Sequence, residues 1–192
     1  MKQERDERMA REFVVGVTGA SGACYARRLL DELGRHATVH VIVSDVAKKI
    51  AEHEGVGLTG LPVQYNDNDR MFAPIASGSY RYDGMVVIPC SQKTLAAIAH
   101  GFADNLITRA ADVCLKERRP LILVPREMPL SEIHLSNMLA AHRAGATIMP
   151  ASPPFYHHPE TIDDLVDMVV ARILDHLGVE HSLAGRWGGS GA

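Results

Sequence analysis

The chain has 192 residues, of which 46% are hydrophobic, and its formal net charge is −3 at pH 7. This length fits one domain with a buried core, and the charge excludes the strongly basic surface of a nucleic-acid-binding protein. No apolar run approaches the roughly 18 residues that a membrane-spanning helix requires. We therefore expect a single domain over residues 1–192, with a charged N-terminal extension at 1–11 and a flexible tail at 188–192.

The cysteines and histidines indicate neither a disulfide framework nor a metal site. Cys24, Cys90 and Cys114 are odd in number and include no C-x-x-C pair. His157 and His158 are adjacent, so on extended backbone they point to opposite sides. The charged N-terminus lacks the apolar core of a signal peptide, and a reducing cytoplasm is the expected location.

Apolar runs alternate with helical segments along the whole chain. The expected strands are residues 13–18, 38–43, 84–88, 121–125 and 146–149. The expected helices are residues 25–33, 46–54, 92–100, one segment that carries Arg109 and Lys116, 131–144 and 160–177. Residues 55–76 are expected to form a long connection with a short strand near Val63 and a short helix near Met71. Continuous apolar strands are typical of parallel sheets buried on both faces, so the pattern predicts a doubly wound, Rossmann-like α/β domain.

Small, hydroxyl-bearing and charged residues follow the predicted strands. Ligands of open α/β sheets bind beyond the carboxyl ends of the strands. The residues expected there are Gly19-Ala20-Ser21, Ser44, Ser91, Arg126-Glu127 and the loop that carries Tyr156. The glycine turn before a helix favours a phosphate site, and without the full G-x-G-x-x-G spacing it fits a mononucleotide better than a dinucleotide. The alternatives are a tight turn that needs small residues and, at Ser91, a plain helix cap.

Charged residues gather around the predicted strand at 121–125. Arg109 and Lys116 are seven residues apart, so on a helix they share a face, and the strand ends directly on Arg126 and Glu127. We expect the cations to converge and to bind an anionic ligand at the crevice. The alternative is that they are solvated helix and loop charges.

Six segments carry a more specific signal: GVTGASGACYARRLL, ASGSY, VIPCSQKTL, ADNLITRAADVCLKERRPLILVPREMPL, GATIMPASPPFYHHP and VARIL. Together they resemble the UbiX-type flavin prenyltransferases, from about residue 13 to residue 187. The resemblance implies a Rossmann-like flavoprotein that transfers a dimethylallyl group from dimethylallyl monophosphate to N5 and C6 of reduced FMN. Its product, prenylated FMN, would serve a UbiD-type decarboxylase, and the chain itself would perform no decarboxylation.

The resemblance also implies site residues. Those that would hold FMN are Gly19, Ala20, Ser21, Ser44, Ser91, Gln92, Lys93, Thr94 and Arg126. Those that would surround the substrate phosphate are Arg109, Lys116, Glu127, Tyr156 and Arg172. Lys116, Glu127 and Ser21 would be catalytic, because cations stabilise the departing phosphate and an oriented carboxyl group moves protons.

Subunit assembly is part of the same implication. The family's sites lie between subunits, and a homo-oligomer, commonly a dodecamer, is expected. Arg172 would reach the site from the final helix or from a neighbouring subunit. The segments around Ile98 and Met138 are candidate contacts, unless they belong to the core.

Two other functions compete with prenyl transfer. A related FMN-dependent cysteine decarboxylase should carry a PxMNxxMW-like substrate clamp, which the sequence lacks. A non-catalytic partner that delivers flavin to a decarboxylase would not need Lys116 and Glu127, and both are present.

Overall fold

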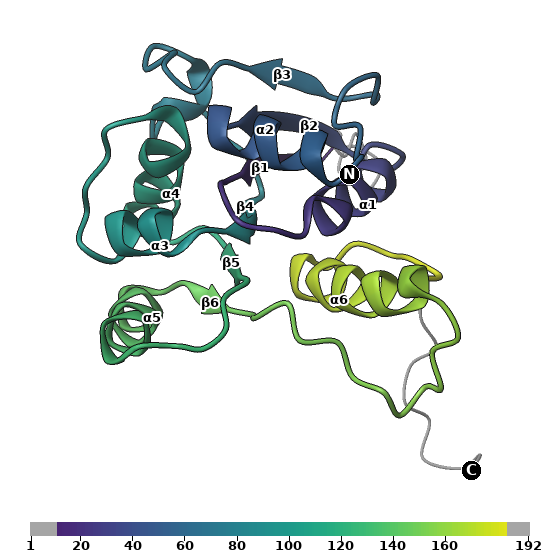
Figure 1. Ribbon diagram of the computed structural model, residues 1–192. Helices are drawn as coiled ribbons and strands as arrows, with labels where there is room; N and C mark the ends of the chain where they lie inside the picture. Colours follow the sequence, from purple (N-terminus) through teal and green to yellow (C-terminus); the bar gives the residue numbers. More distant parts are fainter. Residues whose placement is uncertain (1–10, 184–192) are drawn as a thin grey trace, which may run out of the picture.

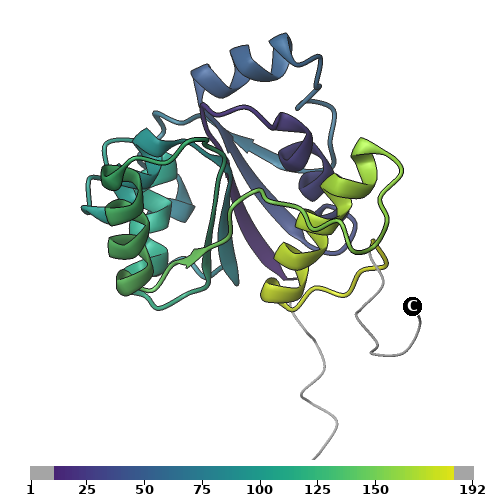
Figure 2. The same cartoon turned by 60° about the horizontal axis from the view of Figure 1, so that its bottom comes forward.

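A computed structural model describes residues 11–183 as a six-stranded parallel sheet between two layers of helices (Figures 1 and 2). The strands are β1 (Glu12–Val17), β2 (Thr38–Val43), β3 (Gln64–Asn66), β4 (Gly84–Cys90), β5 (Leu121–Pro125) and β6 (Thr147–Ile148). The helices are α1 (Ala23–Leu33), α2 (Asp45–His53), α3 (Gln92–Ala99), α4 (Leu106–Lys116), α5 (Glu132–Ala144) and α6 (Ile162–Leu177). The expected extension, apart from Arg11, and the expected tail lie outside the described residues.

The two helical layers bury the two faces of the sheet. Side chains of α1, α2 and α6 join one hydrophobic core, and side chains of α3, α4 and α5 join the other. Figure 2 shows α3 to α5, in teal and green, and α1 with α6, in purple and yellow-green, on opposite sides of the strands. The predicted doubly wound α/β fold is confirmed. No helix within residues 11–183 is long and apolar enough to cross a membrane.

The order of the strands fixes where a ligand can bind. The sheet runs β3-β2-β1-β4-β5-β6, so the chain builds outward from β1 in one direction and from β4 in the other. The crevice beyond the carboxyl ends of β1 and β4 is therefore the topological switch point, which is the usual ligand site in such sheets. The pairing of Val17 with Val43 brings the residues after β1 and β2 side by side, and the pairing of Cys90 with Pro125 does the same for β4 and β5.

The connection before β4 differs from the prediction. The helix expected near Met71 is a single 3-10 turn at Pro74–Ala76, where the proline occupies a position whose N–H a helix would not use. The residues around Met71 form turns instead. Ile98 is only 4% exposed and belongs to the core, so it is not a subunit contact.

Candidate active site

Thr18 joins the two loops that meet at the switch point. Its hydroxyl donates to the carbonyl of Pro89 at 2.9 Å and accepts from the N–H of Ser91 at 2.7 Å, and the residue is 2% exposed. A satisfied buried hydroxyl of this kind fixes the distance between the β1–α1 turn and the β4–α3 turn. From the sequence, Thr18 was expected only as the last residue of the first strand. Its polar side chain at the end of an apolar run, directly before the glycine turn, could have indicated a role at the site.

The glycine turn contains an anion that the chain itself supplies. The carboxylate of Glu54 accepts hydrogen bonds from the N–H of Gly22 at 3.0 Å and from the N–H of Ala23 at 2.8 Å. These are the N–H groups at the start of α1 that a phosphate was expected to use. That part of the prediction is wrong, because a carboxylate already satisfies both donors.

Glu54 also orients Ser21. Burial alone would raise the pKa of Glu54, but hydrogen bonds from the Ser21 hydroxyl and from the Ala23 and Gly22 N–H groups, with help from Arg126, lower it. The carboxylate is therefore ionised at neutral pH and holds the Ser21 hydroxyl in one direction. The Arg126 guanidinium lies on the other side and donates through Nε to the Ser21 carbonyl at 3.1 Å. Ser21 is thus fixed from both sides.

The start of α3 is the open counterpart of the glycine turn. Ser91 caps the helix, because its hydroxyl accepts from the N–H of Thr94 at 3.3 Å and donates to the Thr94 hydroxyl at 3.0 Å. The side-chain amide nitrogen and oxygen of Gln92 are both buried without a hydrogen-bond partner among the described residues. Buried polar atoms normally have partners, so this amide fits a site that a polar ligand completes. The N-terminal N–H groups of α3 favour a phosphate there, and the residues present fit FMN.

The remaining flavin candidates lie at the same edge. Ser44 follows β2 and caps α2 by accepting from the N–H of Ala47 at 3.2 Å, and its own N–H donates to the carbonyl of Val17 at 3.0 Å. Lys93 is on the first turn of α3, 4.0 Å from Asp104 and largely exposed. The strand ends therefore bring together all nine residues predicted to hold FMN: Gly19, Ala20, Ser21, Ser44, Ser91, Gln92, Lys93, Thr94 and Arg126.

Gly19 is needed for packing. A Cβ at this position would lie 2.6 Å from Cγ1 of Val46, on α2. The turn therefore lies directly against α2, which explains a glycine there without any ligand. The packing interpretation of the turn therefore applies, and its role at a ligand edge stays a prediction.

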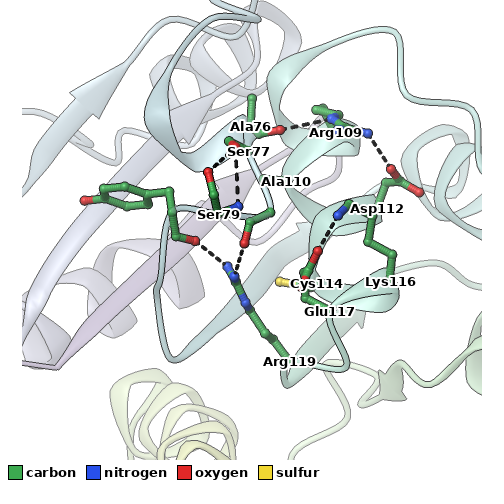
Figure 3. A network of polar contacts seen from close by, with 12 residues as sticks. Ala76, Ser77, Ser79, Arg109, Ala110, Asp112, Cys114, Lys116, Glu117 and Arg119 are labelled. Carbon is green, nitrogen blue, oxygen red and sulfur yellow. Dashed lines mark hydrogen bonds and ion pairs between the residues drawn. The ribbon is translucent and has the colours of Figure 1, made fainter.

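Arg109 and Lys116 share a face of α4, as predicted, but each has its own carboxylate partner (Figure 3). Arg109 pairs with Asp112 at 2.7 Å and donates through Nε to the carbonyl of Ala76 at 3.1 Å. Lys116 pairs with Glu117. The side chains of Arg109 and Lys116 are 34% and 45% exposed. Arg109 and Lys116 are therefore neither fully buried nor unpaired.

One chain does not bring Lys116 and Glu127 together. Lys116 ends α4, which precedes the first residue of β5, whereas Glu127 follows the last residue of β5. A five-residue strand lies between them, which spans about 16 Å. The expected convergence of Arg109, Lys116 and Glu127 at one crevice is thus wrong for a single subunit. The two residues are close in sequence but lie at opposite ends of the strands, because the whole of β5 separates them.

The last two phosphate candidates lie on the surface. Tyr156 is 57% exposed in the loop after β6, and its ring centroid is 4.4 Å from that of His157. Arg172 projects from α6 and pairs with Asp175 at 3.0 Å. Within residues 11–183, no group of three His, Cys, Asp or Glu side chains is arranged to hold a metal ion.

Comparisons with known proteins identify the family of the chain. A family model described as Flavoprotein matches residues 1–174. The flavin prenyltransferase UbiX of Methanocaldococcus jannaschii is 49% identical, and the match covers 92% of this chain and 98% of that protein. A crystal structure of AnUbiX (PadA1) with FMN and dimethylallyl pyrophosphate has a TM-score of 0.92 at 45% identity, covering 95% of this chain and all of that one.

Two further solved structures differ in how similar they are to the chain: one is similar in sequence and structure, the other in fold alone. A dodecameric FMN-dependent UbiX-like decarboxylase from Escherichia coli O157:H7 has a TM-score of 0.89 at 49% identity, covering 93% of this chain and all of that one. The peptidyl-cysteine decarboxylase EpiD has a TM-score of 0.60 at 18% identity, which establishes a common fold alone. By sequence and by structure, the chain belongs to the flavoprotein family and, within it, to the UbiX flavin prenyltransferases.

Proposed function

We propose that this protein transfers a dimethylallyl group from dimethylallyl monophosphate to reduced FMN and releases prenylated FMN. The observation that carries the proposal is the buried, unpaired amide of Gln92 at the open start of α3, on the edge that also holds Ser21 and Arg126. The membership of the chain in the UbiX flavin prenyltransferases supports the reaction type. The likeness to EpiD extends to the fold alone, so no observation favours cysteine decarboxylation.

We expect one part of this edge of the sheet to bind the phosphate of FMN and another part to bind the flavin ring. The first turn of α3, with Ser91, Gln92 and Thr94, would hold the flavin phosphate through N–H and side-chain groups. The hydroxyl of Ser21, held by Glu54, and the Arg126 guanidinium would contact the ring. When bound in its reduced form, FMN supplies the N5 and C6 atoms that accept the dimethylallyl group.

The leaving phosphate needs cations from outside the subunit that holds the flavin. Because Lys116 and Glu127 lie at opposite edges of one sheet, we infer that a second copy presents Arg109 and Lys116 to the edge with Glu127. The two cations would stabilise the charge that the phosphate gains as its bond to carbon breaks. Glu127, exposed beside that site, would take and return the protons of the reaction. Tyr156 and Arg172 would complete the phosphate site.

An apolar surface suits such an assembly. Of the 13 residues of α5, only Asn137 and Ala141 are buried, whereas Ile133, Leu135 and Leu139 are 70%, 54% and 48% exposed. Leu135 and Leu139 are four residues apart and share a face of the helix, and exposed apolar side chains of this kind are typical of a subunit interface. We propose a homo-oligomer, with the dodecamer of the Escherichia coli relative as the expected form. The interface would use these residues of α5 rather than the buried Ile98.

The expected recipient of the product is a UbiD-type decarboxylase, and the expected location is the cytoplasm. All three cysteines are free thiols, which supports a reducing compartment. The recipient is implied by the family resemblance, and the location is supported by the free thiols. Co-purification of the product with a decarboxylase apoenzyme would check the recipient.

Mass spectrometry tests the reaction directly. The protein is incubated without oxygen with reduced FMN and dimethylallyl monophosphate, and the flavin should gain the mass of one dimethylallyl group. Lys116→Ala should retain FMN and slow formation of the adduct about 10²-fold. Lys48→Ala, which also breaks a lysine–carboxylate pair but on α2, is the matched control. Unchanged flavin with the wild-type protein would refute the proposed reaction.

A further inference from the structure

A short segment, residues 76–80, lies along α4 and is here called the strap (Figure 3). Arg119 holds it by donating to the carbonyl of Gly78 at 2.7 Å and to the carbonyl of Tyr80 at 2.8 Å. Arg109 donates to the carbonyl of Ala76 at 3.1 Å. The strap thus supplies a backbone acceptor that fixes the direction of Arg109, one of the two cations assigned to the substrate phosphate.

The strap also touches the second cation. A Cβ on Gly78 would lie 2.5 Å from Nζ of Lys116 and 2.3 Å from Oε1 of Glu117. The glycine lets the ends of these two side chains lie against the backbone, and a Cβ there would make them shift. Any shift of the strap therefore changes the space in which the Lys116 side chain lies. Arg109 and Lys116 are both positioned by one five-residue segment.

The strap is anchored to the sheet at its far end by a polar cluster. The hydroxyl of Tyr80 donates to the carboxylate of Glu12 on β1, and the same carboxylate oxygen lies 2.6 Å from Nε2 of His40 on β2. The His40 side chain is 9% exposed, and its ring meets the Tyr80 ring edge-on at 6.0 Å. The hydrogen bond to Glu12, together with burial and the charge of Glu12, raises the pKa of Tyr80 to about 12. The hydroxyl is therefore a donor throughout the neutral range.

We propose that Tyr80, through its hydrogen bond to Glu12, is a positioning residue for the cations that bind the substrate phosphate. It fixes the strap to the sheet, and the strap fixes Arg109 and Lys116 on α4. This inference rests on the proposed function, because it takes the phosphate of dimethylallyl monophosphate as the ligand of those cations. Tyr80 itself touches no reacting atom.

Steady-state kinetics with Tyr80→Phe test the role. Loss of the anchor should raise KM for dimethylallyl monophosphate about 5- to 20-fold and leave kcat within about twofold, the pattern of lost ground-state binding. The Kd for FMN should not change, because Tyr80 precedes the first residue of β4 whereas Ser91 follows its last residue. Tyr65→Phe is the matched control, since it likewise removes a hydroxyl that donates one hydrogen bond, here to the carbonyl of Leu58 at 2.7 Å.

A second variant separates positioning from general loss of stability. Glu12→Gln weakens the same anchor from the other side, so Tyr80→Phe and Glu12→Gln should each raise KM and the double variant should be no worse than the more affected single one. Additive effects, or an equal loss of FMN affinity, would overturn the inference. If the wild-type enzyme is active and Tyr80→Phe has the wild-type KM, the inference on Tyr80 is wrong and the proposed function stands. A wild-type protein that forms no adduct would overturn the proposed function as well.

Discussion

The carboxylate of Glu54 should stabilise the fold measurably, because it replaces a ligand at the start of α1. It accepts from two backbone N–H groups, at 3.0 Å and 2.8 Å, and from the Ser21 hydroxyl. Loss of a capping side chain costs about 0.5–2 kcal/mol of the free energy of unfolding. The glutamine in Glu54→Gln keeps one acceptor oxygen but no charge, so we expect about 1 kcal/mol. In a chain of this size that lowers Tm by about 2–4 °C.

Thermal unfolding of the flavin-free chain at pH 7 measures this effect. Glu52→Gln makes the same substitution two residues earlier, on the exposed side of α2, and should leave Tm unchanged. Because folding lowers the pKa of Glu54, its contribution is fully present above the ordinary value of 4.5 and is lost as the pH falls through the folded-state pKa. The difference in Tm between wild type and Glu54→Gln should therefore close below about pH 4.5.

Two results would refute this reasoning. The first is Glu54→Gln with the wild-type Tm at pH 7, which would mean that the hydrogen bonds to Gly22 and Ala23 contribute nothing net. The second is a difference in Tm that persists unchanged under acid conditions. In that case the effect would come from the shape of the glutamine side chain and not from the lost charge.

Two further substitutions test the flavin edge and the strap. Gln92→Leu should weaken FMN binding about tenfold yet hold or raise the Tm of the flavin-free protein, because it removes a buried amide that has no partner; a lower Tm with unchanged FMN affinity, measured by fluorescence titration, would contradict this. Gly78→Ala should slow adduct formation about tenfold with FMN still bound at dimethylallyl monophosphate concentrations below KM, because a Cβ would displace the Lys116–Glu117 pair and weaken binding of the substrate phosphate. Gly57→Ala, whose Cβ would meet only Arg27 at 3.6 Å, is the control, and equal rates in the two variants would exclude a role for the strap.

The edge that carries the candidate site could be predicted because parallel strands read as apolar runs that stop at their carboxyl ends. Ser44, Ser91 and Arg126 each follow such a run, and the sheet brings them to one edge. The family resemblance then pointed to the residues on the first turn of α3.

Three features of the site could not be predicted from the sequence. Glu54 reaches an N–H group 32 residues earlier in the chain, and a glutamate just after an amphipathic helix normally lies in solvent. Lys116 and Glu127 are close in sequence, but the strand between them carries them to opposite edges. Nor did the helical spacing of Arg109 and Lys116 indicate that Asp112 and Glu117 would pair with them.

The carboxylate at the start of α1 also decides which way round a ligand can lie. A Rossmann-like sheet consists of two similar halves, and each offers a helix N-terminus to a phosphate. Here Glu54 acts as a built-in substitute for a phosphate in one half, so the internal pseudosymmetry is broken before any ligand arrives. We expect the phosphate of a mononucleotide to be repelled at α1 and attracted at α3. A bound mononucleotide would then take one orientation, and a dinucleotide that needs both ends would be disfavoured.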